Sequence, residues 1–173
     1  PKPIVMPSVD TTEVGTQPLG ETANWGRFPT LDSTNGFANY LANFQQAFVS
    51  FNEQIDFDKN KLPQRILVLG SNEFVWIPLL LAEWLESETQ ANNTNNSTTV
   101  KFSALTRSPI ALGGAISTML SFSDNYGLGM TNFVYNVEPK DWDLIVLCVE
   151  TAADSVDQLW QNLENVLVVG VNK

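Results

Sequence analysis

The stretch that decides the fold is RILVLGSNEFVWIPLLLAEWLESE, residues 65–88. Its first six residues, 65–70, form a short and almost entirely apolar run, which is typical of a strand buried on both faces. Residues 72–88 then show the apolar spacing of a helix. Pro78 is unfavourable inside a helix, so this helix either begins near Trp76 or bends there. A strand that leads at once into a helix is the repeating unit of α/β proteins.

The same alternation continues toward the C-terminus. Further apolar runs predict strands, and TAADSVDQLWQNL at 151–163 has the spacing of a helix. The segment SPIALGGAISTMLSF at 108–122 fits either a helix or a loop. The predicted strands are 65–70, 99–105, 132–137, 143–149 and 165–171. We therefore predict an α/β fold, with a mostly parallel, Rossmann-like open sheet of about five strands and helices on both faces.

Two further features complete the predicted organisation. Residues 1–34 are rich in Pro, Thr, Gly and Ser, and they predict an irregular N-terminal arm packed on the domain. Residues 35–173 form a single predicted α/β domain. It opens with an amphipathic helix over 35–55, where aromatic side chains recur at steps of three and four. The polar run at 88–98 predicts a mobile loop that tolerates deletion.

The composition excludes several classes of function. Nine Lys and Arg residues against 19 Asp and Glu residues give the 173-residue chain a net charge of −10. This argues against binding to nucleic acid or to an anionic membrane, because both need a basic face. The sequence contains no histidine, which excludes His-based triads and most transition-metal sites. Cys148 lies in an apolar run, so we expect it to be a small buried hydrophobic residue. We expect neither a metal nor a cofactor.

The sequence also predicts a cytoplasmic protein. No apolar run reaches the roughly 18 uninterrupted residues that a membrane span requires. No charged and then apolar leader opens the chain. The Asn-x-Ser/Thr triplets at Asn92, Asn95 and Asn96 are then the chance content of a polar loop.

Polar residues follow the first predicted strand, and open parallel sheets bind ligands beyond the carboxyl ends of their strands. In LGSNEF, Gly70 permits close backbone approach to a ligand, and Ser71 or Asn72 is placed to cap the following helix. Backbone N–H groups in such a turn suit a phosphate. The segment is neither a dinucleotide fingerprint nor a P-loop, since it lacks the further glycines and the Gly-Lys-Ser/Thr sequence. A plain turn is the alternative interpretation.

A second polar cluster, LTRSP, follows the second predicted strand. Arg107 offers a planar fork to phosphate or carboxylate, and the hydroxyls of Thr106 and Ser108 flank it. Glu150 and Thr151 follow the fourth strand, so parallel strands would bring all three loops to one edge. The alternative is that Arg107 is a structural loop residue, with Glu150 as its partner.

The ordered set of motifs resembles the TRSP domain family, which is named for the tetrapeptide at 106–109. The preceding VLGSNEFVWIPLLLAEWLE, the NFVYNV at 132–137, the apolar strand that ends in Glu150 and the WGRFP at 25–29 extend the likeness over roughly residues 25–170. The resemblance implies a domain C-terminal to an orotate-phosphoribosyltransferase-like domain, in bacterial gene clusters linked to tellurium resistance and stress. The positions that match the family's motifs are Gly70, Glu73, Thr106, Arg107, Ser108, Pro109, Tyr135, Asn136 and Glu150.

Three functions are compatible with these residues. The first is an accessory domain that binds a phosphorylated, nucleotide-like metabolite for a phosphoribosyltransferase-like domain, fused upstream or acting in trans. The second is a free-standing enzyme acting on a phosphorylated small molecule, with Glu73 or Glu150 as acid–base and Arg107 as anion clamp. The third is a structural or dimerising module, and homodimerisation is left open. No catalytic residue is assigned.

Overall fold

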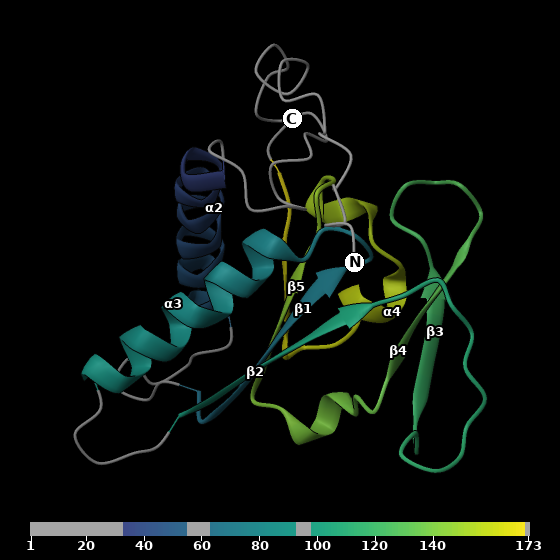
Figure 1. The fold of residues 1–173 in the computed structure, drawn as a ribbon. Coiled ribbons are helices and arrows are strands. Elements are labelled where there is room, and N and C mark those ends of the chain that lie inside the picture. The colour runs from purple at the N-terminus through teal and green to yellow at the C-terminus, as the bar shows by residue number, and fades with distance from the viewer. Residues whose placement is uncertain (1–32, 55–62, 93–97, 172–173) are drawn as a thin grey trace, which may run out of the picture.

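The computed structural model describes residues 33–54, 63–92 and 98–171. They form three layers, with two long helices on one side of a central sheet and a β-hairpin with short helices on the other (Figure 1). The helices are α2 (Ser33–Gln54), α3 (Trp76–Asn92) and α4 (Gln158–Gln161), and the 3-10 turns are η2 (Pro139–Asp141) and η3 (Ala153–Ser155). The strands are β1 (Arg65–Ser71), β2 (Thr99–Leu105), β3 (Met119–Ser123), β4 (Thr131–Tyr135), β5 (Leu144–Cys148) and β6 (Val166–Val169).

The central sheet has four parallel strands in the order β2-β1-β5-β6. The chain moves outward from β1 to β2, returns to the other side of β1 as β5, and ends at β6. Every residue of β5 is buried, as is every residue of β1 after Arg65, which explains their uninterrupted apolar sequences. The predicted α/β class with an open parallel sheet is confirmed.

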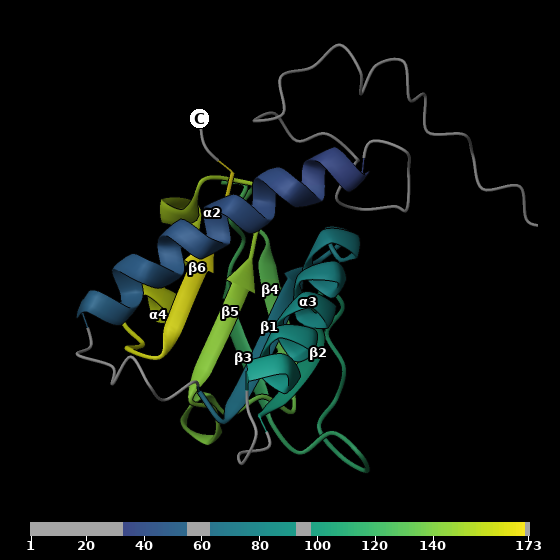
Figure 2. The same cartoon turned by 90° about the vertical axis from the view of Figure 1, so that its left-hand side faces the viewer.

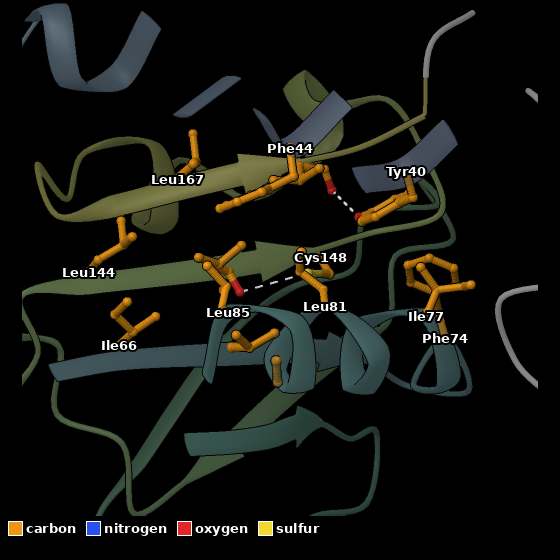
Figure 3. Close-up of a cluster of buried hydrophobic side chains, with 14 residues drawn as sticks. Tyr40, Phe44, Ile66, Phe74, Ile77, Leu81, Leu85, Leu144, Cys148 and Leu167 are labelled. Carbon is orange, nitrogen blue, oxygen red and sulfur yellow. Dashed lines mark hydrogen bonds between the residues drawn. The ribbon is translucent and has the colours of Figure 1, made fainter. Parts of the chain in front are cut away.

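One face of the sheet packs against α2 and α3, which Figure 2 shows crossing in front of the strands. Figure 3 shows how Phe44 of α2 and Leu81 of α3 meet the strand residues Ile66 and Cys148. Tyr40 of α2 is 1% exposed, and its hydroxyl donates to the backbone carbonyls of β6 and of the residue that follows β5. The predicted helix at 35–55 is therefore present, and its aromatic stripe is a core face.

The opposite face packs against the hairpin of β3 and β4 and against α4. Phe122 and Val134 of the hairpin and Trp160 of α4 cover strand residues such as Leu69 and Leu147. The rings of Phe122 and Trp160 meet edge to face, with their centroids 5.0 Å apart. The hairpin is therefore part of the domain core, and its position relative to the sheet is fixed.

The predicted strand at 132–137 lies in this hairpin and not in the parallel sheet. β4 pairs antiparallel with β3, a strand that the sequence analysis left as helix or loop. The reason lies in the burial of β4, where Asn132 and Val134 face inward while Thr131 is exposed. A one-sided alternation of this kind is typical of an antiparallel strand with one solvent face.

Two predicted boundaries also differ. The helix predicted at 151–163 is split into η3 and α4, because Val156 is extended and Asp157 caps a new helix by accepting a hydrogen bond from the Leu159 N–H at 2.9 Å. The loop predicted at 88–98 begins later, since α3 continues to Asn92 and Thr89 is buried. The remainder of that loop, and the N-terminal arm before Ser33, lie outside the described residues. Pro78 falls in the first turn of α3, which begins at Trp76.

Candidate functional site

The carboxyl ends of β1, β2 and β5 lie at one edge of the sheet, because the three strands are parallel. Ser71 at the end of β1 is in register with Leu105 at the end of β2, and Leu69 is in register with Leu147 of β5. The loops that begin with Asn72, Thr106 and Val149 therefore leave from the same edge. None of the described helices is long and apolar enough to cross a membrane.

A cavity of about 510 Å³ opens at this edge. Volumes of this order are typical of small-molecule sites. Its lining combines two loops of the sheet edge with the β3–β4 loop of the hairpin. The lining residues are Asn72, Glu73, Leu105, Thr106, Arg107, Ser108, Tyr126 and Leu128. Four predicted site residues, Glu73, Thr106, Arg107 and Ser108, are thus brought together in one cavity.

The Thr-Arg-Ser segment is held in place from both sides. Thr106 exchanges two backbone hydrogen bonds with Phe133 of β4, at 2.9 and 2.7 Å. The Ser108 N–H donates to the Thr106 hydroxyl oxygen at 3.1 Å. The Tyr135 hydroxyl donates to the Ser108 carbonyl at 2.8 Å and accepts from the Ile110 N–H at 2.6 Å. The backbone on both sides of Arg107 is therefore fixed before any ligand arrives.

Arg107 itself is exposed and makes no ion pair within the part of the chain that the structure describes. Its guanidinium carbon lies 5.5 Å from the centre of the Tyr126 ring, which is within cation–π range. The structural partner that the sequence suggested, Glu150, is buried and accepts a hydrogen bond from the Tyr126 hydroxyl instead. The guanidinium fork therefore faces the cavity without a carboxylate bound to it.

The β3–β4 loop, residues 124–130, is organised by one buried carboxylate. Asp124 Oδ1 accepts from the N–H groups of Tyr126 and Leu128 at 2.8 and 3.1 Å, and Oδ2 accepts from that of Met130 at 2.8 Å. Burial works to raise the pKa of Asp124, but these three hydrogen bonds and the positive charge of Arg107 outweigh it and lower the pKa below its usual value. The loop that carries Tyr126 over the cavity is therefore anchored by an ionised group.

A second carboxylate attaches the same hairpin to α4. Asp157 caps α4 with one oxygen, and its other oxygen accepts from the Ser123 N–H at 2.7 Å. The hydrogen bonds from the Leu159 and Ser123 N–H groups lower the pKa of Asp157, against a smaller opposing effect of burial. Both anchors of the hairpin are therefore aspartates that the fold stabilises in the charged form.

Acid should weaken these anchors. Because folding favours the ionised form, their stabilising effect is complete above the pKa of an unfolded aspartate, about 3.9, and is lost as the pH falls toward the lowered pKa of the folded state. We expect urea titrations to show the free energy of unfolding falling between about pH 4 and pH 2. Asp124→Asn should cost on the order of 1–3 kcal/mol at pH 7 and give a shallower acid decline.

The exposed Asp154 on η3 supplies the control for this prediction. Asp154→Asn should follow the wild-type profile at every pH. An acid decline as steep in Asp124→Asn as in the wild type would show that Asp124 does not contribute to it.

The turn after β1 differs from the sequence-based expectation. A Cβ on Gly70 would lie 2.9 Å from the Phe74 carbonyl oxygen, so the absence of a side chain at Gly70 allows the turn to fold back on its own strand. The N–H groups of Ser71, Asn72 and Phe74 already donate to backbone carbonyls. These three groups are therefore not available to cradle a phosphate.

The side chains of this turn contribute differently. Helix α3 begins only at Trp76, so neither Ser71 nor Asn72 caps it. The Ser71 hydroxyl is fully buried and makes no hydrogen bond, and it does not line the cavity. Both polar atoms of the Asn72 amide are shielded from solvent and without a partner, and this residue does line the cavity. Asn72 therefore lines the cavity, but its amide atoms are turned away from solvent.

Three predicted site residues support the cavity without lining it. Tyr135 holds the Ser108–Ile110 backbone, as described above. Asn136 accepts from the Ser117 N–H at 2.8 Å and donates to the Ala115 carbonyl at 2.8 Å, which fixes the far end of the β2–β3 loop. Glu150 holds Tyr126. Next to it, Asn125 donates to the Thr151 hydroxyl at 2.7 Å, so two bonds tie the β3–β4 loop to the end of β5.

Sequence reasoning missed Tyr126, Leu128 and the anchoring role of Asp124. The available signal was the segment DNYGLG at 124–129, where an Asp followed by two glycines is typical of a tight loop. Gly127 and Gly129 both have positive φ, at 72° and 69°. Within the described segments, no group of three or more His, Cys, Asp or Glu side chains is arranged to hold a metal ion.

Comparison with known proteins identifies the family. Residues 32–167 match the family described as the TRSP domain C-terminal to PRTase_2. No curated protein and no solved structure matches the chain. The match includes every residue that lines the cavity. The chain therefore belongs to the TRSP domain family.

Proposed function

We propose that this domain is an accessory ligand-binding module of a phosphoribosyltransferase-type biosynthetic protein, and that it binds a phosphate-bearing, nucleotide-like metabolite in the cavity at the sheet edge. The family description, which places the domain next to PRTase_2, supports the association. The resemblance to proteins of bacterial tellurium-resistance and stress clusters supports a cytoplasmic stress-response setting. The observation that carries the proposal is the exposed, unpaired Arg107 fork in the cavity.

The charge of the protein makes local donors necessary for an anionic ligand. The net charge of −10 repels anions from the molecule as a whole, so an anion must be held by local donors. Arg107 supplies several N–H donors in a rigid plane, and charge-assisted hydrogen bonds contribute about 1.5–3 kcal/mol each. The Thr106 oxygen is occupied as an acceptor, which leaves its hydrogen to donate to a ligand oxygen. The exposed Ser108 hydroxyl extends this set.

The remaining lining suits the rest of a nucleotide. The Tyr126 ring and the apolar side chains of Leu105 and Leu128 offer a surface against which a flat base can pack. Glu73 on the rim is an acceptor that would repel a second phosphate but can receive hydrogen bonds from sugar hydroxyls. The cavity therefore fits a monophosphate with one aromatic end better than a polyphosphate.

Calorimetric titration of nucleoside monophosphates and ribose phosphates tests the proposal. Arg107→Ala should weaken binding at least tenfold, while the free energy of unfolding changes by no more than about 0.5 kcal/mol, as for an exposed residue. Arg107→Lys should restore part of the affinity, because an ammonium group keeps the charge but lacks the planar fork. Lys101→Ala removes the same charge from an exposed position on β2 and should bind as the wild type does.

Two results would reject the proposal. The first is that the wild type binds none of these compounds. The second is that Arg107→Ala unfolds the domain while the folded fraction binds with unchanged affinity, which would make the Thr-Arg-Ser segment a structural clasp. Turnover of a phosphoester by the domain alone would favour the alternative of a free-standing enzyme.

A further inference from the structure

The segment at 108–137 is almost without charge. In a chain with 28 Lys, Arg, Asp and Glu residues, these 30 residues contain only Asp124. The carboxylate of Asp124 is buried and directed at the backbone of its own loop, so it gives the surface little charge. The β2–β3 loop and the hairpin therefore present an uncharged surface on a strongly acidic protein.

The same segment holds most of the exposed large apolar side chains. Seven such side chains are found among the described residues, and five of them belong to this segment. They are Ile110, Leu112, Met119, Leu128 and Met130, with exposures of 38–64%. We call these five residues the uncharged face. Figure 1 shows that the hairpin and its loops form the outermost layer, on the side away from α2 and α3.

Three residues of this face are held by hydrogen bonds or strand pairing. Ile110 and Met119 are both attached to Tyr135. The Ile110 N–H donates to the Tyr135 hydroxyl, and Met119 pairs with Tyr135 across the hairpin. Met130 belongs to the loop that Asp124 organises at the other end of the hairpin. A charge-depleted surface with exposed Met, Leu and Ile is typical of a protein interaction site.

We infer that the uncharged face is the docking surface for the PRTase_2 domain beside which this family is found. The family description names PRTase_2 as the neighbouring domain. A domain tethered in this way has a high effective concentration, so a modest contact surface is enough for it to dock. Leu128 belongs both to the face and to the cavity lining, so a docked domain would cover the cavity mouth. The docking itself does not depend on the proposed ligand.

Binding measurements with the separately expressed PRTase_2 domain encoded in the same genome, on the same polypeptide or another, test this inference. Wild type should bind saturably, and Leu112→Asp should weaken binding at least tenfold. Val49→Asp on α2 is the matched control, because Val49 and Leu112 are both 57% exposed and Val49 lies on the opposite side of the sheet. Val49→Asp should bind as the wild type does. Circular dichroism should show that both variants remain folded.

Three outcomes would overturn the inference. One is the absence of binding by the wild type up to about 1 mM, the order of the effective concentration that a short tether provides. Another is an equal loss in Val49→Asp. The third is self-association of the isolated chain, in analytical ultracentrifugation, that Leu112→Asp abolishes, since this would assign the face to a second copy. Arg107→Ala should lose ligand binding but keep docking, which separates failure of this inference from failure of the proposed function.

Discussion

Replacing Trp160 with alanine should lower the free energy of unfolding by about 3–5 kcal/mol, as expected for truncation of a fully buried aromatic side chain. Trp160 is 1% exposed and packs edge to face on Phe122. Its indole N–H makes no hydrogen bond, so the loss comes from packing and from the cavity left behind. Urea titration followed by circular dichroism measures the change.

The same substitution should also weaken ligand binding, although Trp160 does not line the cavity. The contact between Trp160 and Phe122 holds β3, and β3 leads directly into the loop that carries Tyr126. Trp160→Phe provides the control, because it keeps an aromatic ring against Phe122 and removes the unpaired N–H. We expect it to retain most of the stability and affinity. A cost below about 1 kcal/mol for Trp160→Ala would show that the hairpin does not depend on this contact.

The parallel sheet was predictable because its signal is local. β1 and β5 are buried on both faces, so nearly every residue in them is apolar, and a short apolar run can be recognised without knowledge of its neighbours. The hairpin was less predictable. In β3, Phe122 is buried between the exposed Ser121 and Ser123, and only the pairing with β4 makes this sequence a strand. Pairing partners are a property of the whole chain.

The residues of the candidate site also differ in how far the sequence could predict them. That Glu73 and Arg107 would lie at one edge followed from the parallel order of their strands. That Tyr126 would reach over them could not be predicted, because it depends on a loop that is anchored through Asn125 and Glu150 to the end of β5. The packing role of Gly70 was hard to predict for a related reason. A glycine after a strand can serve ligand approach or chain packing, and the packing role is visible only in the distance to Phe74.

Gly170→Ala should destabilise the domain by about 1–3 kcal/mol or more, because it places a methyl group where backbone atoms already lie. The added Cβ would overlap the carbonyl oxygen of Thr151 and lie 2.6 Å from the Ala153 nitrogen. These are backbone atoms, so the clash cannot be relieved by a side-chain rotation. The turn at 151–153 would have to move away from Val171, whose N–H donates to the Thr151 carbonyl at 3.0 Å.

The functional consequence of Gly170→Ala follows from what this turn supports. The Thr151 hydroxyl accepts from Asn125, so a shift of the turn displaces an anchor of the loop over the cavity. We therefore expect weaker binding of the phosphate-bearing ligand together with the lost stability. Gly114→Ala is the comparison, since Gly114 has a positive φ but no atom within 4 Å of a Cβ, and it should show only the strain of that conformation, about 1–2 kcal/mol, with unchanged affinity. If Gly170→Ala were as stable as the wild type, the turn at 151–153 would be able to move without cost. The hydrogen bond between Asn125 and Thr151 could then not anchor the β3–β4 loop.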